Sequence, residues 1–206
     1  MSPHAVLGLL LQYPDADILA ARADIAAACR KLLESPTRTE SLHGFLSWWV
    51  DAPPYDLQAT YVDTFDLGRR CALHLTYPLL GDRRERGMAL LRLKRRYATH
   101  GFAITDAELP DYLPVMLDYA AASADGTAVL REHRVPLELL RAALHENGSA
   151  YAAVVDALCD LLSPLTEEQR AQVQRIAAEG PPMETVGLEP FAPPDVMPAM
   201  PGELRR

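Results

Sequence analysis

Residues 15–32 read DADILAARADIAAACRKL, and the spacing of their apolar side chains is that of an amphipathic α-helix. The apolar positions recur at steps of three and four, which places them on one face of the helix. These positions are Ile18, Ala21, Ile25, Cys29 and Leu32. Asp15 directly follows Pro14 and is a suitable N-cap, because its carboxylate can accept hydrogen bonds from free backbone N–H groups of the first turn. A helix with one face toward a core is therefore predicted from residue 15 onward.

The same spacing recurs along most of the chain. It marks further helical segments at residues 42–49, 57–65, 90–97, 137–144 and 151–162. Thr166 with Gln169 forms a capping-box pattern for one more helix, which Gly180 would end. The alternation of apolar and polar residues that is typical of strands is nearly absent. We therefore expect an all-α fold, a single helical domain of about nine to ten helices over residues 1–180.

Residues 181–206 differ from the rest of the chain in composition. They contain seven of its 17 prolines. A proline-rich segment cannot sustain a helix, because proline lacks the backbone N–H and clashes with the preceding turn. We expect this second region to be a flexible, irregular tail.

The composition excludes several classes of protein. Of the 206 residues, 49% are hydrophobic and 23% are charged, which is typical of a folded domain and not of a disordered chain. No apolar run approaches the roughly 18 to 20 residues that a membrane span requires, so we expect no stable membrane insertion. No Lys or Arg precedes the apolar residues 5–11 and no small-residue cleavage site follows them. The N-terminal segment thus argues against a secretory signal and favours a cytoplasmic location.

The sequence contains no recognisable set of catalytic or metal-binding residues. It lacks the glycine-rich nucleotide motifs and the GxSxG nucleophile motif. Cys29, Cys71 and Cys159 are far apart and form no CxxC pair, so neither a disulfide framework nor a zinc site is indicated. The six histidines do not pair at HxxxH or HExxH spacing. We therefore expect a protein that is not an enzyme and that carries no metal and no cofactor.

Residues 69–96 form a basic segment in an otherwise acidic chain. They include nine Lys and Arg but only two acidic residues, a net charge of +7, whereas the whole chain carries −8 and the remainder therefore −15. One interpretation is a solvated helix face whose arginines pair with the protein's own acidic residues. The other is a patch for an anionic partner, either phosphate groups or an acidic protein surface, with nucleic acid least favoured because the acidic remainder would repel it. The patch would consist of Arg83, Arg84, Arg86, Arg92, Arg95 and Arg96.

Residues 108–119, ELPDYLPVMLDY, combine acidic, aromatic and apolar side chains. If Asp111 is the N-cap of a helix, the proline three residues later falls in the first turn, where a missing N–H costs little. One helix face then has the composition of a groove for a short apolar and basic peptide. This face would carry Asp111, Tyr112, Met116, Asp118 and Tyr119. In the alternative interpretation, Asp111 only caps the helix and the aromatic rings belong to the core.

Four segments of the chain resemble, in order, segments of the NarJ family. They are LLQYPD at 10–15, YVDTFDLGR at 61–69, GDRRERGMA at 81–89 and ELPDYLP at 108–114. NarJ proteins are assembly chaperones of respiratory nitrate reductase and relatives of the TorD-type redox-enzyme maturation proteins. The resemblance extends over roughly residues 5–165. One position departs from the family pattern, because many relatives have a Glu-His pair where this chain has Tyr77-Pro78, and a role of that pair has no counterpart here.

The resemblance implies an all-helical, non-catalytic chaperone of the cytoplasm with a TorD/NarJ-like fold. Such a protein binds the N-terminal peptide of the catalytic (alpha) subunit of nitrate reductase and holds the apoprotein off the membrane until the molybdenum cofactor is inserted. The cofactor insertion machinery is a further candidate partner. The family's motif positions, with the acidic and aromatic face described above, give the expected peptide-binding residues. These are Tyr61, Phe65, Asp66, Arg69, Glu108, Asp111, Tyr112, Leu113, Met116, Asp118 and Tyr119.

Two other interpretations remain open. The first is a chaperone of the same fold for a different molybdoenzyme, such as a dimethyl sulfoxide or trimethylamine N-oxide reductase. The second is a small helical nucleotide-binding factor that uses the arginines of residues 69–96 for phosphates, although the missing phosphate-binding loop disfavours it.

Overall fold

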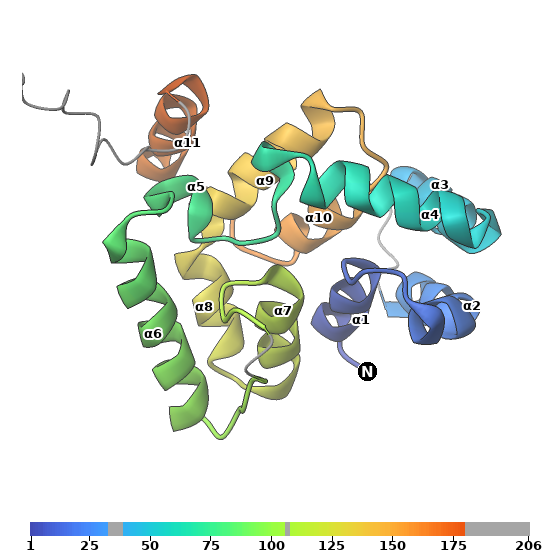
Figure 1. The fold of residues 1–206 in the computed structure, drawn as a ribbon, viewed down its shortest axis with the longest axis horizontal. Helices are drawn as coiled ribbons and strands as arrows, with labels where there is room; N and C mark the ends of the chain where they lie inside the picture. The colour runs from blue at the N-terminus through green and yellow to red at the C-terminus, as the bar shows by residue number, and fades with distance from the viewer. Residues whose placement is uncertain (33–38, 106–107, 180–206) are drawn as a thin grey trace, which may run out of the picture.

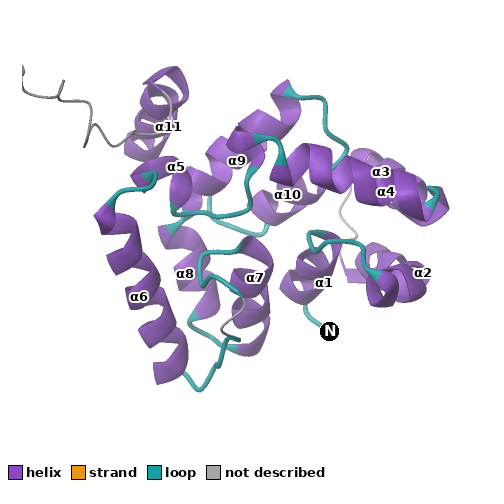
Figure 2. Cartoon of the chain, in the orientation of Figure 1, coloured by secondary structure: helices purple, strands orange, loops and turns teal. Residues whose placement is uncertain are grey.

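The structure, a computed structural model, describes residues 1–32, 39–105 and 108–179. Within these ranges the chain is helical and contains no strand, so the predicted all-α fold is confirmed (Figure 2). The described part has eleven α-helices, one more than the upper expectation, because the single turn of α5 is too short to show a periodic pattern. They are α1 (Pro3–Leu10), α2 (Ala16–Leu32), α3 (Thr39–Asp51), α4 (Pro54–Tyr61), α5 (Tyr77–Leu80), α6 (Arg84–Thr99), α7 (Leu113–Ala122), α8 (Gly126–Glu132), α9 (Arg134–Glu146), α10 (Ala152–Asp160) and α11 (Glu167–Glu179). A π-helix, η1 (Val62–Asp66), and a 3₁₀-helix, η2 (Arg69–Cys71), lie between α4 and α5. In the described ranges, no helix has the length and apolar character needed to cross a bilayer.

Helix α1 lies between α2 and α7 and is covered on almost every side (Figure 1). Its sequence, PHAVLGLL, explains this position, because a helix that is apolar all round has no face for solvent. Val6, Leu7 and Leu10 are fully buried. Gly8 allows α7 to approach closely, since a Cβ atom at this position would lie only 3.3 Å from the Leu117 Cβ. The first helix is therefore part of the core.

Two of the predicted helix caps are present. The Asp15 carboxylate accepts hydrogen bonds from the backbone N–H groups of Asp17 and Ile18, both at 3.0 Å. Thr166 and Gln169 form the reciprocal capping box, with bonds of 3.0 and 3.1 Å. The glycine expected to end α11 and the proline-rich tail, residues 180–206, lie outside the described residues.

The predicted apolar stripes form the core, with an aromatic cluster at its centre. Tyr151 packs against Phe45 and Phe65, with ring centroids 5.3 and 4.8 Å apart, and Tyr61 lies 4.8 Å from Phe65. These contacts join α3, α4, η1 and the N-cap of α10, and they hold the rings of Tyr61 and Phe65 against the core. Leu32 is an exception to the stripe of α2, because it is exposed at the end of that helix.

Gly126 is where α8 packs against α7, and we expect this position to tolerate no side chain. A Cβ atom here would lie 2.1 Å from the Ala120 Cα and 2.7 Å from its backbone nitrogen, and a helix backbone cannot yield cheaply. Gly126→Ala should therefore lower the free energy of unfolding by about 1 to 3 kcal/mol in urea titrations. Gly87→Ala is the matched control, because a Cβ there meets nothing within 4 Å. It should raise stability by up to about 1 kcal/mol; equal effects at the two glycines would contradict the close packing of α7 and α8.

Candidate functional site

A cleft of about 240 Å³ opens where four separate segments of the chain meet. Four of its eight lining residues are tyrosine or phenylalanine, and the others include one acidic side chain and one imidazole. Its lining residues are Tyr13, Tyr61, Phe65, Asp66, Ala72, Leu73, His74 and Tyr112.

The end of α4 and the π-helix η1 that follows it bring three of these side chains, Tyr61, Phe65 and Asp66, to the cleft. Helix α4 ends at Tyr61, and the next turn closes with a hydrogen bond from the Leu67 N–H to the Val62 carbonyl at 3.0 Å, which spans five residues instead of four. In a regular α-helix Asp66 would point well away from Tyr61, whereas the wider turn directs Phe65 and Asp66 to either side of it. Such π-turns are frequent at functional sites.

A short antiparallel pairing forms the opposite wall. The Leu75 N–H donates to the Asp111 carbonyl at 3.0 Å, and the Leu113 N–H donates to the Leu73 carbonyl at 2.8 Å. This pairing sets His74 beside Tyr112, with ring centroids 5.5 Å apart. The wall is therefore held by backbone hydrogen bonds and does not depend on the rings that it presents.

The tyrosine hydroxyls connect the two walls. Tyr61 donates to the Leu11 carbonyl at 3.1 Å, and its hydroxyl lies 3.0 Å from that of Tyr112. Burial and the neighbouring phenol of Tyr112 raise the pKa of Tyr61, so this hydroxyl stays protonated at neutral pH. Tyr13 packs edge-on against Tyr61 at 5.5 Å and is 43% exposed, which makes it the ring most accessible from outside.

Asp111 lies behind the wall and is fully buried. One carboxylate oxygen lies 3.1 Å from the His74 Nδ1. The other accepts from the Thr76 hydroxyl at 2.5 Å and from the Arg86 guanidinium at 3.3 Å. Burial alone would raise the pKa of Asp111, but the hydrogen bonds from His74 and Thr76 and the charge of Arg86 outweigh it and hold the pKa below its ordinary value. Asp111 is therefore an ionised structural group that supports the cleft from inside.

The position of Asp111 and the direction of its side chain differ from the expected N-cap on a helix face. Helix α7 begins at Leu113 with Tyr112 at the N-cap, so Asp111 precedes the helix and cannot share a face with Asp118. Its carboxylate points inward, where it accepts hydrogen bonds from His74, Thr76 and Arg86. A buried carboxylate needs such partners, and the free backbone N–H groups at the start of α7 would not supply a positive charge.

The other predicted peptide-binding residues divide into three groups. Tyr61, Phe65, Asp66 and Tyr112 line the cleft. Leu113, Met116 and Tyr119 are fully buried in the core, as in the alternative interpretation of this segment. Arg69, Glu108 and Asp118 are outside the set that lines the cleft. Sequence reasoning missed Tyr13 and His74, although Tyr13 belongs to the LLQYPD segment.

Two carboxylates bring negative charge to the cleft. Asp66 lines it, and Glu108 is exposed nearby. The pKa of Tyr112 is raised, first by burial and also by the negative charges of Glu108 and Asp66, despite the opposing hydrogen bond with Tyr61. Burial and the charge of Glu108 likewise raise the pKa of Asp118, which lies on α7 against Gly8. The cleft thus combines aromatic rings with an acidic rim, which favours a cationic or mixed apolar and basic ligand.

The arginines of the predicted patch in residues 69–96 fall into two groups, paired and exposed. Arg86 bonds Asp111, and Arg96 forms ion pairs with Asp125 at 2.6 Å and Glu132 at 2.7 Å. These two arginines follow the interpretation in which the basic side chains pair with the protein's own acid. The remaining members of the predicted patch, Arg83, Arg84, Arg92 and Arg95, are exposed.

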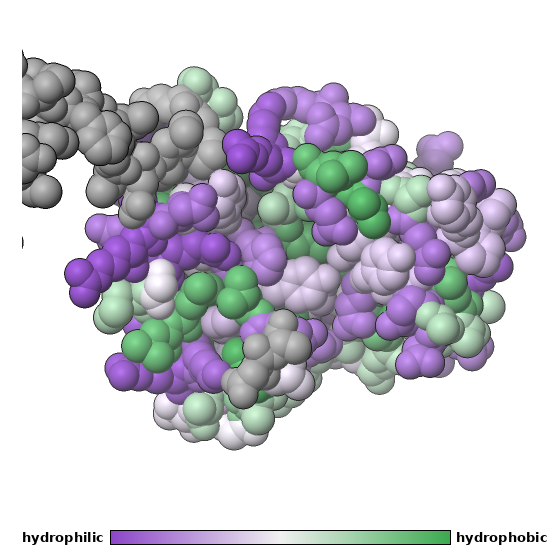
Figure 3. Space-filling view, in the orientation of Figure 1, coloured by the Kyte–Doolittle hydropathy of each residue, from purple (hydrophilic) through white to green (hydrophobic). Residues whose placement is uncertain are grey.

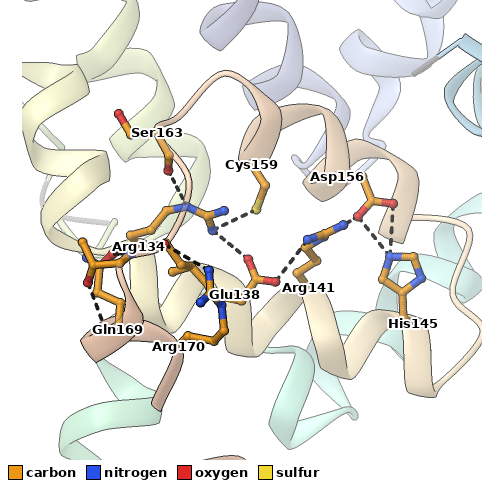
Figure 4. Close-up of polar contacts among 11 residues, drawn as sticks. Arg134, Glu138, Arg141, His145, Asp156, Cys159, Ser163, Gln169 and Arg170 are labelled. Carbon is orange, nitrogen blue, oxygen red and sulfur yellow. Dashed lines mark hydrogen bonds and ion pairs between the residues drawn. The ribbon is translucent and has the colours of Figure 1, made fainter. Parts of the chain in front are cut away.

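A second polar network joins α9 to α10, and its contacts are those of a structural clamp (Figure 4). The buried Arg134 donates to Glu138 at 2.8 Å and to the Cys159 sulfur at 3.3 Å. Arg141 bridges Glu138 and Asp156, at 3.1 and 2.5 Å. Burial raises the pKa of the Cys159 thiol to about 11, so the sulfur is not a thiolate at neutral pH and is a poor nucleophile. Among the described residues, no group of three or more His, Cys, Asp or Glu side chains is placed to hold a metal ion.

The known proteins that the chain resembles in sequence belong to one family. Residues 23–157 match the family described as nitrate reductase delta subunit. The chain is 32% identical over 177 residues to the nitrate reductase molybdenum cofactor assembly chaperone NarJ of Escherichia coli (strain K12), covering 84% of this chain and 75% of that protein. It is 36% identical over 156 residues to a NarJ protein of Bacillus subtilis (strain 168), covering 75% and 84% respectively.

A solved structure has a similar fold. It is the crystal structure of a protein from Archaeoglobus fulgidus described as a redox enzyme maturation protein. The two structures superpose with a TM-score of 0.59 at 22% identity, over 78% of this chain and 93% of the other. All cleft-lining residues except Tyr13 fall within the matched residues 23–157.

Proposed function

The chain belongs to the nitrate reductase delta subunit family, and we propose that it serves as a nitrate reductase molybdenum cofactor assembly chaperone. It would act in the cytoplasm by binding the catalytic subunit before cofactor insertion and membrane attachment, and not by turnover. The observation that supports a binding role is the cleft, whose rings and carboxylate form a recognition surface without a nucleophile and base in contact.

The ligand of the cleft would be the N-terminal segment of the catalytic subunit. Aromatic walls favour apolar side chains and also attract cations to their faces, and Asp66 with Glu108 adds negative charge. A volume of about 240 Å³ is smaller than a typical small-molecule pocket and suits one or two side chains of a longer segment. The surface therefore fits a short peptide that carries apolar and basic residues.

Calorimetric titration with a synthetic peptide of about the first fifteen residues of the nitrate reductase catalytic subunit tests this function. We expect a dissociation constant in the micromolar to nanomolar range. Asp66→Asn combined with Glu108→Gln should weaken binding about three- to tenfold, because rim charges contribute modestly in solvent. The control is Asp24→Asn with Glu40→Gln, which makes the same chemical change at exposed positions on α2 and α3.

Three outcomes separate the alternatives. If the peptide from the nitrate reductase catalytic subunit did not bind the wild-type chain, the chain would not recognise the N-terminus of that subunit. Equal affinity of the rim variant and its control would contradict the acidic rim. Tighter binding of the corresponding peptide from a trimethylamine N-oxide reductase would assign the chaperone to a different molybdoenzyme.

A further inference from the structure

The outer side of α6 takes no part in the cleft or in the core. Its residues recur at helical intervals and therefore lie on one side of the helix. All of them are exposed, including two large apolar side chains, Met88 at 52% and Leu91 at 39%. This outer α6 face consists of Arg84, Met88, Leu91, Arg92 and Arg95.

The inner side of α6 holds the helix in place. Leu93 and Tyr97 are buried against the core. Near the start of the helix, Arg86 bonds both Thr76 and Asp111, at 3.2 and 3.3 Å. Near its end, Arg96 pairs with acidic side chains of the α7–α8 region. The helix is thus anchored along its length, and the outer α6 face is not needed for the fold.

The arginines of the outer α6 face lack the partners that the inner arginines have. Within the described residues, no acidic side chain forms an ion pair with Arg84, Arg92 or Arg95. Like charges on successive turns repel one another, which disfavours the helix by a few tenths of a kcal/mol per pair. An acidic surface placed against this face would remove that repulsion.

The distribution of side chains resembles that of a protein interface. The space-filling view shows a hydrophobic area that extends from the middle of α6 toward the segment before α7, with strongly hydrophilic side chains above and below it (Figure 3). An apolar centre with a charged rim, in which Met and Arg are enriched, is typical of interfaces between proteins. The flexible thioether of Met88 also adapts easily to a partner's surface.

We infer that the outer α6 face docks an acidic, partly apolar surface of the client subunit outside its N-terminal segment. This rests on the proposed function, since the client is the chain whose N-terminus the cleft would hold. A cleft for one or two side chains offers little area, and a second contact with the same chain would act at high effective concentration. Nucleic acid and anionic membranes are less favoured, because their negative charge is extended and would also face the rest of the chain, which carries −15, whereas a local acidic patch on a protein would face only the outer α6 face.

The test uses the purified apo catalytic subunit without about its first fifteen residues, so that the cleft has no ligand. The wild-type chaperone should bind it, and Arg92→Glu with Arg95→Glu should weaken binding at least about tenfold. Binding should also weaken as salt is added. The matched control is Arg30→Glu with Lys31→Glu, which makes the same change in net charge at exposed positions of α2, at the other end of the molecule's long axis (Figure 1).

Two parallel titrations make the result specific. The N-terminal peptide should bind the α6 variant and the wild type with equal affinity. If that peptide failed to bind the wild type, the proposed function of the cleft would be contradicted. The test of the outer α6 face would still hold, because it uses a subunit without this peptide. No binding of the truncated subunit, or equal weakening by the α6 variant and its control, would overturn the inference. So would an α6 variant that loses affinity only for phosphatidylglycerol vesicles or duplex DNA.

Discussion

Replacement of Asp111 by alanine is expected to lower the free energy of unfolding by about 3 to 5 kcal/mol, because it removes one member of a buried ion pair. Arg86 would keep its charge in a site where its side chain is only 18% exposed. The Thr76 hydroxyl and backbone N–H would both lose their acceptor. Urea denaturation followed by circular dichroism measures the change.

Three further variants show whether the loss comes from the buried network. Asp111→Asn retains the shape of the side chain and should be milder than Asp111→Ala. A double-mutant cycle with Arg86→Met should give a coupling energy of about 0.5 to 3 kcal/mol. The exposed Asp66→Asn is the control and should change stability by no more than about 0.5 kcal/mol. If Asp111→Ala lowered the free energy of unfolding by no more than the control does, Asp111 would not stabilise the fold as part of a buried ion pair.

The same carboxylate sets a pH dependence of stability. Its pKa in the folded protein lies below the ordinary value of 3.8, because hydrogen bonds and the charge of Arg86 outweigh the effect of burial. A group with a lowered folded pKa stabilises the protein above its unfolded pKa, and this contribution is lost as the pH falls through the folded pKa. The wild type should therefore lose more stability than Asp111→Ala when the pH falls below about 4.

The helices could be predicted from the sequence because their determinants are local. The stripe of α2 and the caps at Asp15 and Thr166 depend on residues within one or two turns, and the structure contains them. The break between α4 and η1 could not be predicted, because the apolar spacing of Tyr61 and Phe65 fits a continuous α-helix equally well.

The cleft could be predicted only in part, because its walls come from distant segments. Asp66 and Tyr112 were identified by their composition and family motifs. Asp111 carries the same signal, yet its direction is decided by Thr76 and Arg86, which are 35 and 25 residues away in sequence. His74 was missed for the same reason, since only the pairing of two loops brings it to Tyr112.

The sequence alone also could not show which arginines of α6 have acidic partners. Arg95 and Arg96 are neighbours in sequence, but the rotation of about 100° per residue in a helix places only Arg96 near acidic partners. The net charge of the segment therefore indicated a basic surface, whereas only the packing of α6 shows which arginines remain for a partner.

Replacement of Tyr112 by alanine is expected to weaken binding of the N-terminal peptide about 30- to 100-fold. Tyr112 forms one wall of the cleft and lies between His74 and the hydroxyl of Tyr61. A tyrosine in such a position is a typical hot spot, where truncation costs about 2 kcal/mol or more. Calorimetric titration of the variant with the same peptide measures the loss.

Two substitutions separate the role of the ring from other effects. Tyr112→Phe retains the ring and removes the hydrogen bond with Tyr61, so it should weaken binding by less than about fivefold if the ring carries the affinity. Tyr55→Ala truncates a tyrosine that is 78% exposed on α4 and should leave affinity unchanged. Urea denaturation of Tyr112→Ala must show a folded protein under the titration conditions. Wild-type affinity in a folded Tyr112→Ala variant, together with loss of peptide binding in Arg92→Glu/Arg95→Glu, would move the N-terminal segment from the cleft to α6.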